Sequence, residues 1–289
     1  MKHKIKKQEL LSLGKKYWIQ LRDVEKIICK KNQLTKEEFF LLDEIDISDN
    51  SLHELKALLR KVSFGYPLEY ILESAEFYGL DFYVDKRCLI PRDDTEIMVD
   101  EAIKTLEKLT HSIYIDVWTW SWAISVAIVD NISKNIAKGF AVDISTKALE
   151  IAKINIKKYS LENKIELLKS DLLNKINFST EGFSPLNYII TANLPYIKDE
   201  DYWNMDKEVI LHEPAVALYW WKKTGFELYE KLITQIFEIK KNNIKKIILF
   251  IEIWFDQKEV AIAFLEKYNL DYRVFRDSWW VDRCIKVMF

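Results

Sequence analysis

The sequence predicts an α/β protein with a mostly parallel sheet, preceded by a separate helical segment. From residue 113 onward, apolar runs typical of buried strands alternate with longer runs typical of amphipathic helices. This alternation indicates a parallel sheet whose strands are joined by crossover helices. Hydrophobic residues make up 49% of the chain and charged residues 30%, which allows a sizeable core beneath a charged surface. At 289 residues, the chain can form one large or two modest domains.

Residues 1–72 are expected to form an all-helical domain. An apolar stripe begins at Leu10 and Leu11, and Thr35 followed by Glu38 is typical of a helix start. No cluster of catalytic residue types occurs in this segment. We therefore expect it to serve packing or recognition.

Residues 73–92 are predicted to connect the helical domain to the sheet domain. Within them, residues 76–84 have the pattern of a β-hairpin with Gly79 at its turn. Pro91 is typical of a helix start, so the second domain is expected to span residues 93–289. Its predicted strands are residues 113–117, 139–143, 165–168, 186–190, 244–253, 272–275 and 283–289, and the helices between them are 123–129, 145–158, 226–239 and 257–265.

Composition and charge exclude several classes of protein. The net charge of −2 and the pI of about 6.2 argue against a general nucleic-acid binder. Cys29, Cys88 and Cys284 are far apart and are expected to be reduced thiols of a cytoplasmic protein. The basic residues 1–7 precede no signal-peptide core, and no apolar run approaches the length of a membrane span. We expect no membrane association, no stable nucleic-acid partner and no metal site.

The strongest candidate for a functional site is the stretch Thr-Ala-Asn-Leu-Pro-Tyr-Ile at residues 191–197. Pro195 has no N–H for a sheet ladder and therefore ends the preceding strand. Asn193, at the carboxyl end of a parallel strand, is expected to face the crevice where such sheets bind ligands. Its side-chain oxygen and a neighbouring backbone carbonyl can accept both hydrogens of a planar NH2 group, against which Tyr196 can lie. This pattern suits methylation of an amide or an exocyclic amine; a plain strand-ending turn is the alternative.

Three acidic residues lie at or near successive strand ends. Asp143, after the second strand, is placed to accept hydrogen bonds from ribose hydroxyls. Asp171, after the third strand, can reach an adenine amino group, and Asp116, at the first, can meet an ammonium. A single acid at such a position is more often a helix cap. Three in register with the strand order favour a cofactor that carries adenosine and an amine, as S-adenosylmethionine (SAM) does.

At these positions the chain resembles the class I SAM-dependent methyltransferases, which have a Rossmann-like seven-stranded sheet. More closely, it resembles the HemK/PrmC family, the protein-(glutamine-N5) methyltransferases that modify peptide chain release factors. The resemblance covers almost the whole chain. It rests on Gly65-Tyr66-Pro67-Leu68-Glu69-Tyr70-Ile71, Glu76-Phe77-Tyr78-Gly79-Leu80, Leu89-Ile90-Pro91-Arg92 with Thr95-Glu96, Asn193-Leu194-Pro195-Tyr196-Ile197, His212-Glu213-Pro214 with Ala217-Leu218, and Asp282-Arg283.

The resemblance implies transfer of a methyl group from SAM to the side-chain amide nitrogen of a glutamine in a release factor. It implies catalytic and substrate-binding roles for Asn193, Leu194, Pro195 and Tyr196, with the carbonyl of residue 194 accepting a substrate hydrogen bond. The family has proline where this chain has Leu194, which supplies the same carbonyl with less preorganisation. Arg92 either serves the substrate or is an ordinary surface charge. The residues expected to bind the cofactor are Asp116, Trp118, Thr119, Trp120, Ser121, Trp122, Asp143, Asp171, Leu172 and Asn193.

Two other functions remain open at this point. Asn-Leu-Pro-Tyr also resembles the motif of ribosomal-RNA adenine dimethyltransferases, which keeps adenine-N6 methylation of RNA or DNA as an alternative. The acidic pI and the helical N-terminal domain count against it. A binding protein that retains the fold without catalysis is a third interpretation, and it requires that the tryptophans after the first strand are genuine.

Those tryptophans are the largest departure from the family pattern. After the first strand the family has Asp-x-Gly-x-Gly-x-Gly, whereas this chain has Trp118, Trp120 and Trp122 at the three glycine positions. Glycine permits positive φ and close approach of the backbone to a cofactor, whereas indoles would fill the cofactor's space. The chain has 10 Trp and 6 Gly, although ordinary usage of about 7% predicts roughly 20 Gly.

We therefore hypothesise that most of these tryptophans are glycines in the living protein. The codon UGA is read as glycine in some bacterial lineages and as tryptophan in a common alternative translation table. Trp18 follows a helix-like segment at a position where glycine is favoured, and Trp203 is less clear. Trp220, Trp221, Trp254, Trp279 and Trp280 also fall on glycines of the family.

Overall fold

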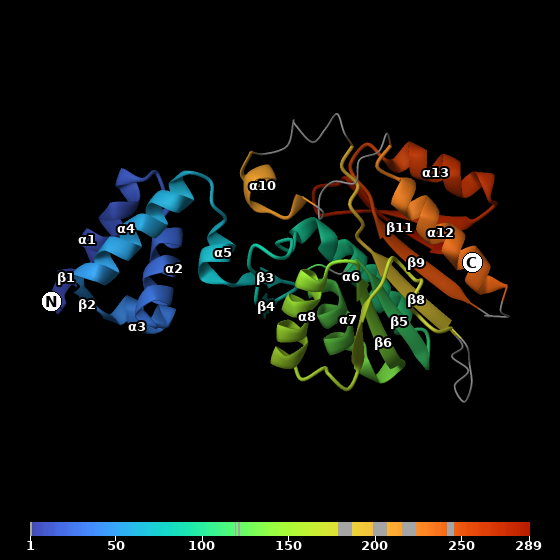
Figure 1. The fold of residues 1–289 in the computed structure, drawn as a ribbon, viewed down its shortest axis with the longest axis horizontal. Helices are drawn as coiled ribbons and strands as arrows, with labels where there is room; N and C mark the ends of the chain where they lie inside the picture. The colour runs from blue at the N-terminus through green and yellow to red at the C-terminus, as the bar shows by residue number, and fades with distance from the viewer. Residues whose placement is uncertain are drawn as a thin grey trace. The chain divides into compact units, whose positions relative to one another are not determined.

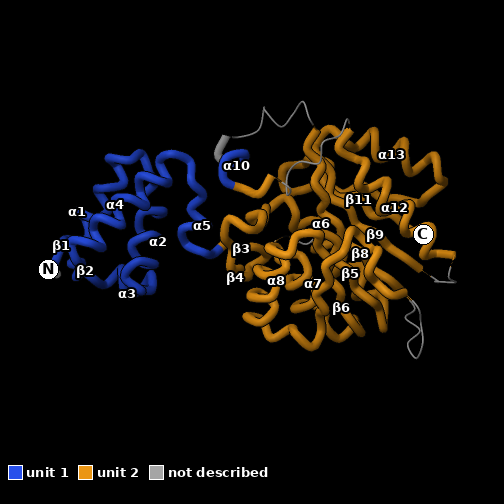
Figure 2. The backbone as a smooth tube through the Cα atoms, viewed as in Figure 1, with its two compact units in different colours: residues 1–74, 206–212 blue, residues 75–205, 213–289 orange. Residues whose placement is uncertain are grey.

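The computed structural model divides the chain into two units, which Figure 2 colours separately. The first unit contains residues 1–74 and 206–212, and the second contains residues 75–205 and 213–289. The structure describes residues 2–118, 120, 122–178, 187–198, 207–215, 224–241 and 246–289. The predictions for Thr119, Ser121, Trp203, Ala217, Leu218, Trp220 and Trp221 lie outside the described residues.

Short helices make up most of the first unit (Figure 1). The helix start predicted at Thr35 is confirmed, because Glu38 N donates to Thr35 Oγ1 and Thr35 N donates to Glu38 Oε2. Leu10, Ile27 and Leu59 belong to the buried core of this unit. Its helices are α1 (Lys7–Lys16), α2 (Leu21–Asn32), α3 (Lys36–Leu41), α4 (Asp49–Ser63), α5 (Leu68–Leu72) and α10 (Lys207–His212).

The first unit also contains strands, which corrects the prediction that residues 1–72 are all-helical. β1 (Lys2–Lys6) and β2 (Glu44–Ser48) pair antiparallel. The register sets Lys4 opposite Asp46, and opposite charges on facing residues stabilise such a pair. Both isoleucines of β2 are buried in the core of the unit. Each strand is only five residues long. The alternation of buried and exposed residues is therefore too short to be distinguished from the helical patterns on either side.

The second unit is built on a seven-stranded sheet with the order β10-β11-β9-β8-β5-β6-β7 (Figure 1). Strands β5 to β9 are mutually parallel, whereas β11 runs antiparallel to β9 and β10 antiparallel to β11. All seven predicted strands are present, and the α/β fold is confirmed. The strands are β5 (Ser112–Val117), β6 (Ile136–Asp143), β7 (Ile165–Lys169), β8 (Asn187–Ala192), β9 (Ile247–Glu252), β10 (Asp271–Arg276) and β11 (Asp282–Met288).

Helices cover both faces of the sheet. The chain order reverses between β5 and β8, since β6 and β7 lie on one side of β5 and β8 and β9 on the other. With right-handed crossovers, this reversal sends α6 to α8 to one face and α12 and α13 to the other, as Figure 1 shows. Ligands bind at the carboxyl ends of the strands at such a switch point. The helices are α6 (Glu96–Leu106), α7 (Ala123–Ile132), α8 (Thr146–Lys158), α12 (Glu227–Lys240) and α13 (Lys258–Lys267), with 3₁₀ turns η1 (Asp93–Thr95) and η2 (Ser133–Asn135).

A small hairpin precedes the sheet and belongs to the second unit. Its strands are β3 (Ala75–Phe77) and β4 (Leu80–Phe82), which pair antiparallel. Tyr78 and Gly79 join them, and both have positive φ, at 51° and 71°. Two consecutive residues of this kind are typical of a tight hairpin turn, which matches the turn predicted at Gly79.

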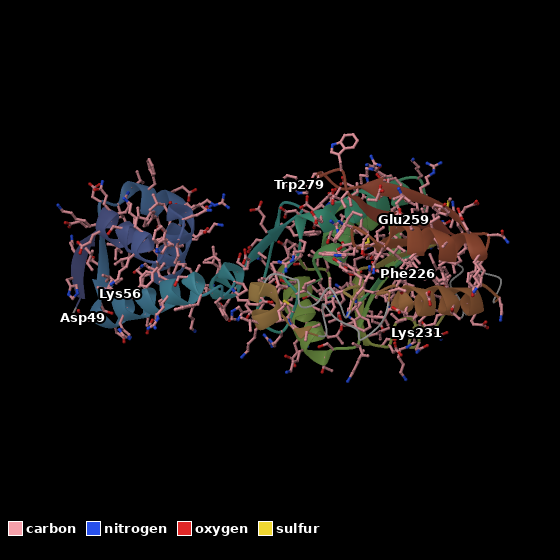
Figure 3. All side chains as sticks on the ribbon, turned by 90° about the horizontal axis from the view of Figure 1, so that it is seen from above. Asp49, Lys56, Phe226, Lys231, Glu259 and Trp279 are labelled. Atoms are coloured by element: carbon pink, nitrogen blue, oxygen red, sulfur yellow. The ribbon has the colours of Figure 1, made fainter. Side chains whose placement is uncertain are left out.

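The side chains of the second unit form a dense interior, with few large apolar groups outside it (Figure 3). Phe226, at the start of α12, is fully buried, whereas Trp279 is 76% exposed and projects from the unit. Among the described residues, no helix is both long and apolar enough to cross a membrane. The same residues contain no group of three or more His, Cys, Asp or Glu side chains that could hold a metal ion.

Candidate active site

Two neighbouring strands bring the candidate residues together. The register pairs Val117 of β5 with Ala192 of β8, so the chain leaves the sheet at adjacent positions through Trp118 and Asn193. This is the switch point between the two halves of the sheet. The segment predicted as a site therefore lies beside the loop after the first strand, as parallel pairing requires.

A small pocket lies at this edge of the sheet. Asn193 lines it together with Arg92, Pro91 and Thr95, and Trp120 contributes from the loop after β5. Two segments singled out in the sequence, Leu89 to Arg92 and Asn193 to Tyr196, thus lie at one place in the fold. The remaining cavity has a volume of about 20 Å³.

Asn193 is held at the mouth of this pocket. Its side chain is 9% exposed, and its Nδ2 donates to Thr95 Oγ1 at 3.4 Å. Its backbone carbonyl oxygen accepts from the indole Nε1 of Trp120 at 3.1 Å. The donor end of the amide is therefore directed to the protein, which leaves Oδ1 as the end that can accept from a ligand.

The Leu-Pro-Tyr segment that follows is held by hydrogen bonds from three other elements. Tyr196 donates its hydroxyl to Glu252 Oε1 at 3.0 Å, at the end of β9. Gln257 Nε2 donates to the backbone oxygen of Tyr196, also at 3.0 Å. Tyr229, on α12, accepts from Leu194 N at 3.1 Å and donates to the backbone oxygen of Glu252.

Glu252 is the buried acid of this network. It is 2% exposed, and burial raises the pKa of its carboxyl. Burial and the neighbouring Glu252 also raise the pKa of Tyr196 well above its ordinary value, so the phenol remains a donor. Sequence analysis missed Glu252, Tyr229 and Gln257. Glu252 was visible as an acid ending an apolar strand, but the two others have no local signal.

The three predicted cofactor acids lie in different environments. Asp143 ends β6 and is 1% exposed, and it accepts from Ser145 N at 2.7 Å and Trp120 N at 3.2 Å. Burial outweighs these donors and raises its pKa to about 7. Asp143 therefore lies beside the loop after β5, as its predicted role requires.

The other two acids are engaged within the protein. Asp116 is fully buried and accepts from Ser125 Oγ at 2.5 Å and Thr191 Oγ1 at 2.8 Å. Asp171 forms an ion pair with Lys231 at 2.6 Å, and its side chain is 42% exposed. Leu172 beside it is buried. None of the three lines the pocket at Asn193.

Arg92 has a partner in the second unit. Its guanidinium forms an ion pair with Glu213, whose side chain is 2% exposed and also accepts from Ile90 N at 3.3 Å. A buried carboxylate needs such compensation. The pair joins the Ile-Pro-Arg segment to the His-Glu-Pro segment through Glu213.

The residues present do not fit a SAM molecule. Trp118, Trp120 and Trp122 are at most 4% exposed. Trp120 lines the pocket at Asn193, its indole donates to the backbone oxygen of Asn193, and its ring contacts that of Trp118. A cavity of about 20 Å³ is about the size that holds one water, whereas pockets for organic ligands measure roughly 300–1,000 Å³. The cleft predicted for the cofactor is therefore filled by tryptophan.

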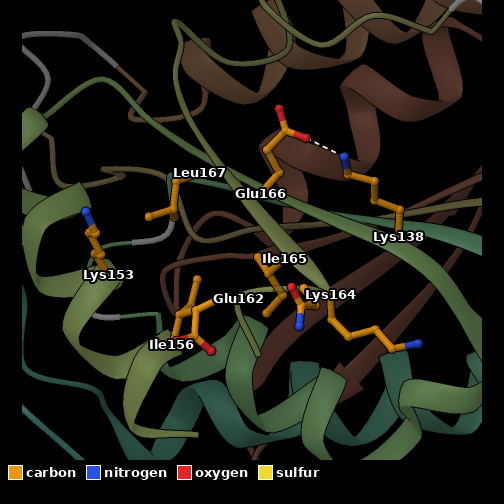
Figure 4. Close-up of a pocket in the computed structure, with 9 residues that line it drawn as sticks. Lys138, Lys153, Ile156, Glu162, Lys164, Ile165, Glu166 and Leu167 are labelled. Carbon is orange, nitrogen blue, oxygen red and sulfur yellow. Dashed lines mark hydrogen bonds and ion pairs between the residues drawn. The ribbon is translucent and has the colours of Figure 1, made fainter. Parts of the chain in front are cut away.

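A larger pocket lies elsewhere in the second unit. It has a volume of about 420 Å³ and follows the edge strand β7, where Lys138 pairs with Glu166 (Figure 4). Lys153 and Lys164 line it as well. None of the predicted site residues belongs to this pocket, so its size does not make it the candidate site.

Comparison with known proteins identifies relatives that match most of the chain. No family model matches. The chain is 34% identical over 248 residues to "Release factor glutamine methyltransferase" of Buchnera aphidicola subsp. Schizaphis graminum, covering 86% of this chain and 84% of that protein. It is 31% identical over 258 residues to the protein of the same name in Dictyoglomus turgidum, with coverage of 89% and 87%. Among solved structures, the hMettl16 catalytic domain in complex with the MAT2A 3′UTR hairpin 1 matches with a TM-score of 0.53 at 13% identity, covering 80% of this chain and 79% of that one. That likeness shows the fold alone.

Proposed function

Because the chain belongs to the release factor glutamine methyltransferase family, we propose that it transfers a methyl group from SAM to the side-chain amide nitrogen of a glutamine in a peptide chain release factor. The observation that carries this proposal is the position of Asn193, at a switch point of the sheet and beside Tyr196. A translation-related role of this kind places the protein in the cytoplasm.

The chemical difficulty of the reaction lies in the nucleophile. The lone pair of an amide nitrogen is delocalised into the carbonyl, so the site must orient the amide for in-line attack on a methyl group. We assign this orientation to Asn193 Oδ1 and the backbone carbonyl of Leu194, which would accept the two amide hydrogens. The ring of Tyr196 would lie against the amide plane and fix its rotation.

The hydrogen bonds around this segment support the assignment. The amide of Asn193 is oriented by Thr95, and the backbone of Leu194 is held by Tyr229. Tyr196 is held at its hydroxyl by Glu252 and at its backbone by Gln257. Binding groups that are fixed before the substrate arrives lose little entropy on binding, which favours catalysis by positioning.

SAM would supply the methyl group, and the positive charge would pass from its sulfur to the amide nitrogen, which would then release one of its two protons to solvent. A strong general base is then not required of the pocket. Tyr196 is not suited to act as a base, because its pKa is raised and its hydroxyl donates to Glu252. The acidic side chains near the segment position it rather than abstract a proton from the substrate.

The substrate class can be tested with protein purified from its own cells. The protein is incubated with methyl-labelled SAM and either a release factor or bare ribosomal RNA. We expect label in the release factor, and we expect it to disappear when the accepting glutamine is changed to glutamate. Label found in RNA alone would overturn the assignment in favour of an adenine methyltransferase.

A further inference from the structure

In the part of the chain that the structure describes, tryptophan occupies left-handed backbone positions more often than glycine, of which three of five have positive φ. An L-residue in this region brings its Cβ close to the following carbonyl oxygen, and a bulky residue there is a genuine outlier. The structure describes seven of the ten tryptophans, and five of these have φ between 51° and 72°. By contrast, Tyr78 is the one tyrosine or phenylalanine of the described residues with positive φ. The five tryptophans are Trp18, Trp118, Trp120, Trp122 and Trp280, and the glycines with positive φ are Gly65, Gly79 and Gly225.

Trp18 stands at the glycine position of a helix C-terminus. Helix α1 ends at Lys16, and Trp18 has φ of 59°. Trp18 N donates to Lys15 O at 3.4 Å, and Ile19 N donates to Gly14 O at 3.0 Å. These two bonds define a Schellman motif, in which the left-handed residue is usually glycine. The indole of Trp18 is 97% exposed, so burial offers no compensation for the strain.

Trp280 stands at the glycine position of a hairpin. Asp277 N donates to Val281 O at 2.9 Å, and Trp280 N donates to Asp277 O at 3.1 Å, which closes the three-residue loop between β10 and β11. The third residue of such a loop adopts the left-handed conformation and is typically glycine. Trp280 has φ of 64° and is 78% exposed.

The loop after β5 contains the other three. Trp118 continues the sheet ladder by donating its N–H to Val142 O at 2.8 Å, and Trp122, with φ of 72°, caps the start of α7. This is the first strand-to-helix turn of a doubly wound sheet, where glycine lets the backbone approach a phosphate or nucleoside. The Nε1 donor of Trp122 is buried without a hydrogen-bond partner among the described residues, which destabilises the fold.

We propose that residues 18, 118, 120, 122 and 280 are glycines in the protein as its own cells make it. The codon UGA explains the substitution, because one variant genetic code reads it as tryptophan and another as glycine. Translation with the wrong code puts tryptophan at glycine positions whatever the local geometry. Independent mutations would not, since they would introduce many residue types and would avoid the positions where a large side chain strains the backbone. The count of 10 Trp against 6 Gly has the same origin.

Glycine at the three loop positions opens the cleft at the switch point. Glycine at residues 118, 120 and 122 removes three buried indoles, of which that of Trp120 lies against the backbone oxygen of Asn193. It also frees the backbone carbonyl of Asn193 from the Trp120 indole. That the opened cleft takes SAM rests on the proposed function, whereas the identity of the five residues rests on backbone geometry and composition and is independent of that function.

Mass spectrometry of the protein isolated from its own cells tests the residue identities. Trypsin releases residues 109–134 as one peptide that contains all three loop positions, and other peptides cover residues 18 and 280. We expect fragment masses of glycine at all five positions. A peptide without tryptophan in the sequence, such as residues 139–147, serves as the control for correct identification. A tryptophan mass at any of the three loop positions would overturn the proposal.

A binding measurement tests the consequence for the cleft without requiring activity. The tryptophan form, which carries Trp at all ten positions of the printed sequence, is compared by calorimetry with the triple variant Trp118→Gly, Trp120→Gly, Trp122→Gly, using S-adenosylhomocysteine as the probe. We expect a gain in affinity of about 100-fold or more, since a filled cleft offers the ligand almost no contact area. Trp18→Gly is the matched control and should leave affinity unchanged. Equal affinities for the triple variant and the tryptophan form would refute the opened cleft.

The two proposals can fail separately. Glycine masses in a protein that does not methylate a release factor would contradict the proposed function and leave the residue assignment standing. Tryptophan masses in a protein that does methylate a release factor would contradict the residue assignment and leave the proposed function standing.

Discussion

Two segments leave the same edge of the sheet from adjacent strands, and they differ in how well their residues suit their conformations. In the Asn193–Tyr196 segment the first three residues are buried and Tyr196 is half-buried, and four of its polar groups bond to Thr95, Tyr229, Glu252 and Gln257. The 118–122 loop holds three buried tryptophans with positive φ, and Trp120 lines a pocket with only about 20 Å³ of free volume. A gene losing its function would be expected to decay in both segments. Because only glycine positions are altered, and always to tryptophan, the difference between the segments supports translation of UGA with the wrong genetic code over loss of function.

The largest expected effect concerns the Asn193–Tyr196 segment. In the form with glycine at residues 118, 120 and 122, Asn193→Ala should lower turnover by about 1,000-fold, as does loss of a group that orients the reacting atoms. Affinity for SAM should change only a few-fold, because Asn193 mainly holds the substrate amide. Steady-state kinetics and calorimetry separate the two quantities. A large loss of SAM affinity with normal turnover would reverse the roles assigned to the two segments.

A pH effect is expected from Asp143, which the loop buries. Its pKa is about 7 in the folded tryptophan form, against an ordinary value of 3.8. Between these values the native state keeps a proton that the unfolded state has released, so the free energy of unfolding falls as pH rises and levels off above the folded pKa. A pKa difference of this size corresponds to about 4 kcal/mol.

The measurement is denaturant unfolding of Asp143→Asn and of the unsubstituted tryptophan form at several pH values. Asparagine stays neutral, so its stability relative to aspartate should rise from about pH 4 to about pH 7. The dependence should shrink in the triple glycine variant, where water reaches the carboxylate. A difference independent of pH would show that Asp143 is ionised in the folded state.

Asp143 is also expected to affect the affinity for the cofactor. In the form with the glycine loop, Asp143→Ala should weaken SAM binding by about 1–3 kcal/mol, because ribose hydroxyls would lose a charged acceptor. Calorimetry with Asp171→Ala as a second variant compares this loss with the loss caused by removing the acid predicted to reach the adenine amino group. Normal SAM affinity in Asp143→Ala would show that the ribose lies elsewhere.

The hydroxyl of Tyr196 allows a test of preorganisation within the Asn193–Tyr196 segment. Tyr196→Phe keeps the ring and removes the donor to Glu252. We expect the free energy of unfolding to fall by about 1–2 kcal/mol, since a buried carboxyl loses a partner. Tyr272→Phe is the matched control, because its hydroxyl also donates to a glutamate but at an exposed site. Equal effects of the two changes would argue against a special role of the buried network.

The smallest expected effect is the relief of backbone strain at Trp280, which can be separated from the loss of an exposed indole by comparison with Trp279. Trp279 and Trp280 lie in one loop and are 76% and 78% exposed, but only Trp280 has positive φ. Trp280→Gly should raise the free energy of unfolding by about 1 kcal/mol, the strain of a left-handed L-residue. Trp279→Gly should not, because glycine there only adds entropy to the unfolded chain. Thermal unfolding of both variants provides the comparison.

Much of the second unit could be predicted because its signals are local. The seven strands, the main helices and the turn at Gly79 follow from apolar periodicity and turn residues, which act within a few neighbouring positions. Pro195 marked the end of β8, and its position at a parallel strand end predicted that Asn193 faces the ligand crevice. The strand order that puts Asn193 at the switch point came from the structure. The pairing of β1 with β2 was missed because each strand is short and its partner lies far along the chain.

The sequence by itself determined the α/β fold, the family and the position of Asn193 at a strand end. It also showed that tryptophan stands at the three glycine positions of the family in the loop after β5. Only the tertiary structure decided that Glu252, Tyr229 and Gln257 hold the Asn193–Tyr196 segment, and that Asp116 bonds to Ser125 and Thr191 inside the unit. Local patterns depend on residues that are neighbours in the chain, whereas buried polar groups take partners wherever packing brings them, often from elements far apart in sequence.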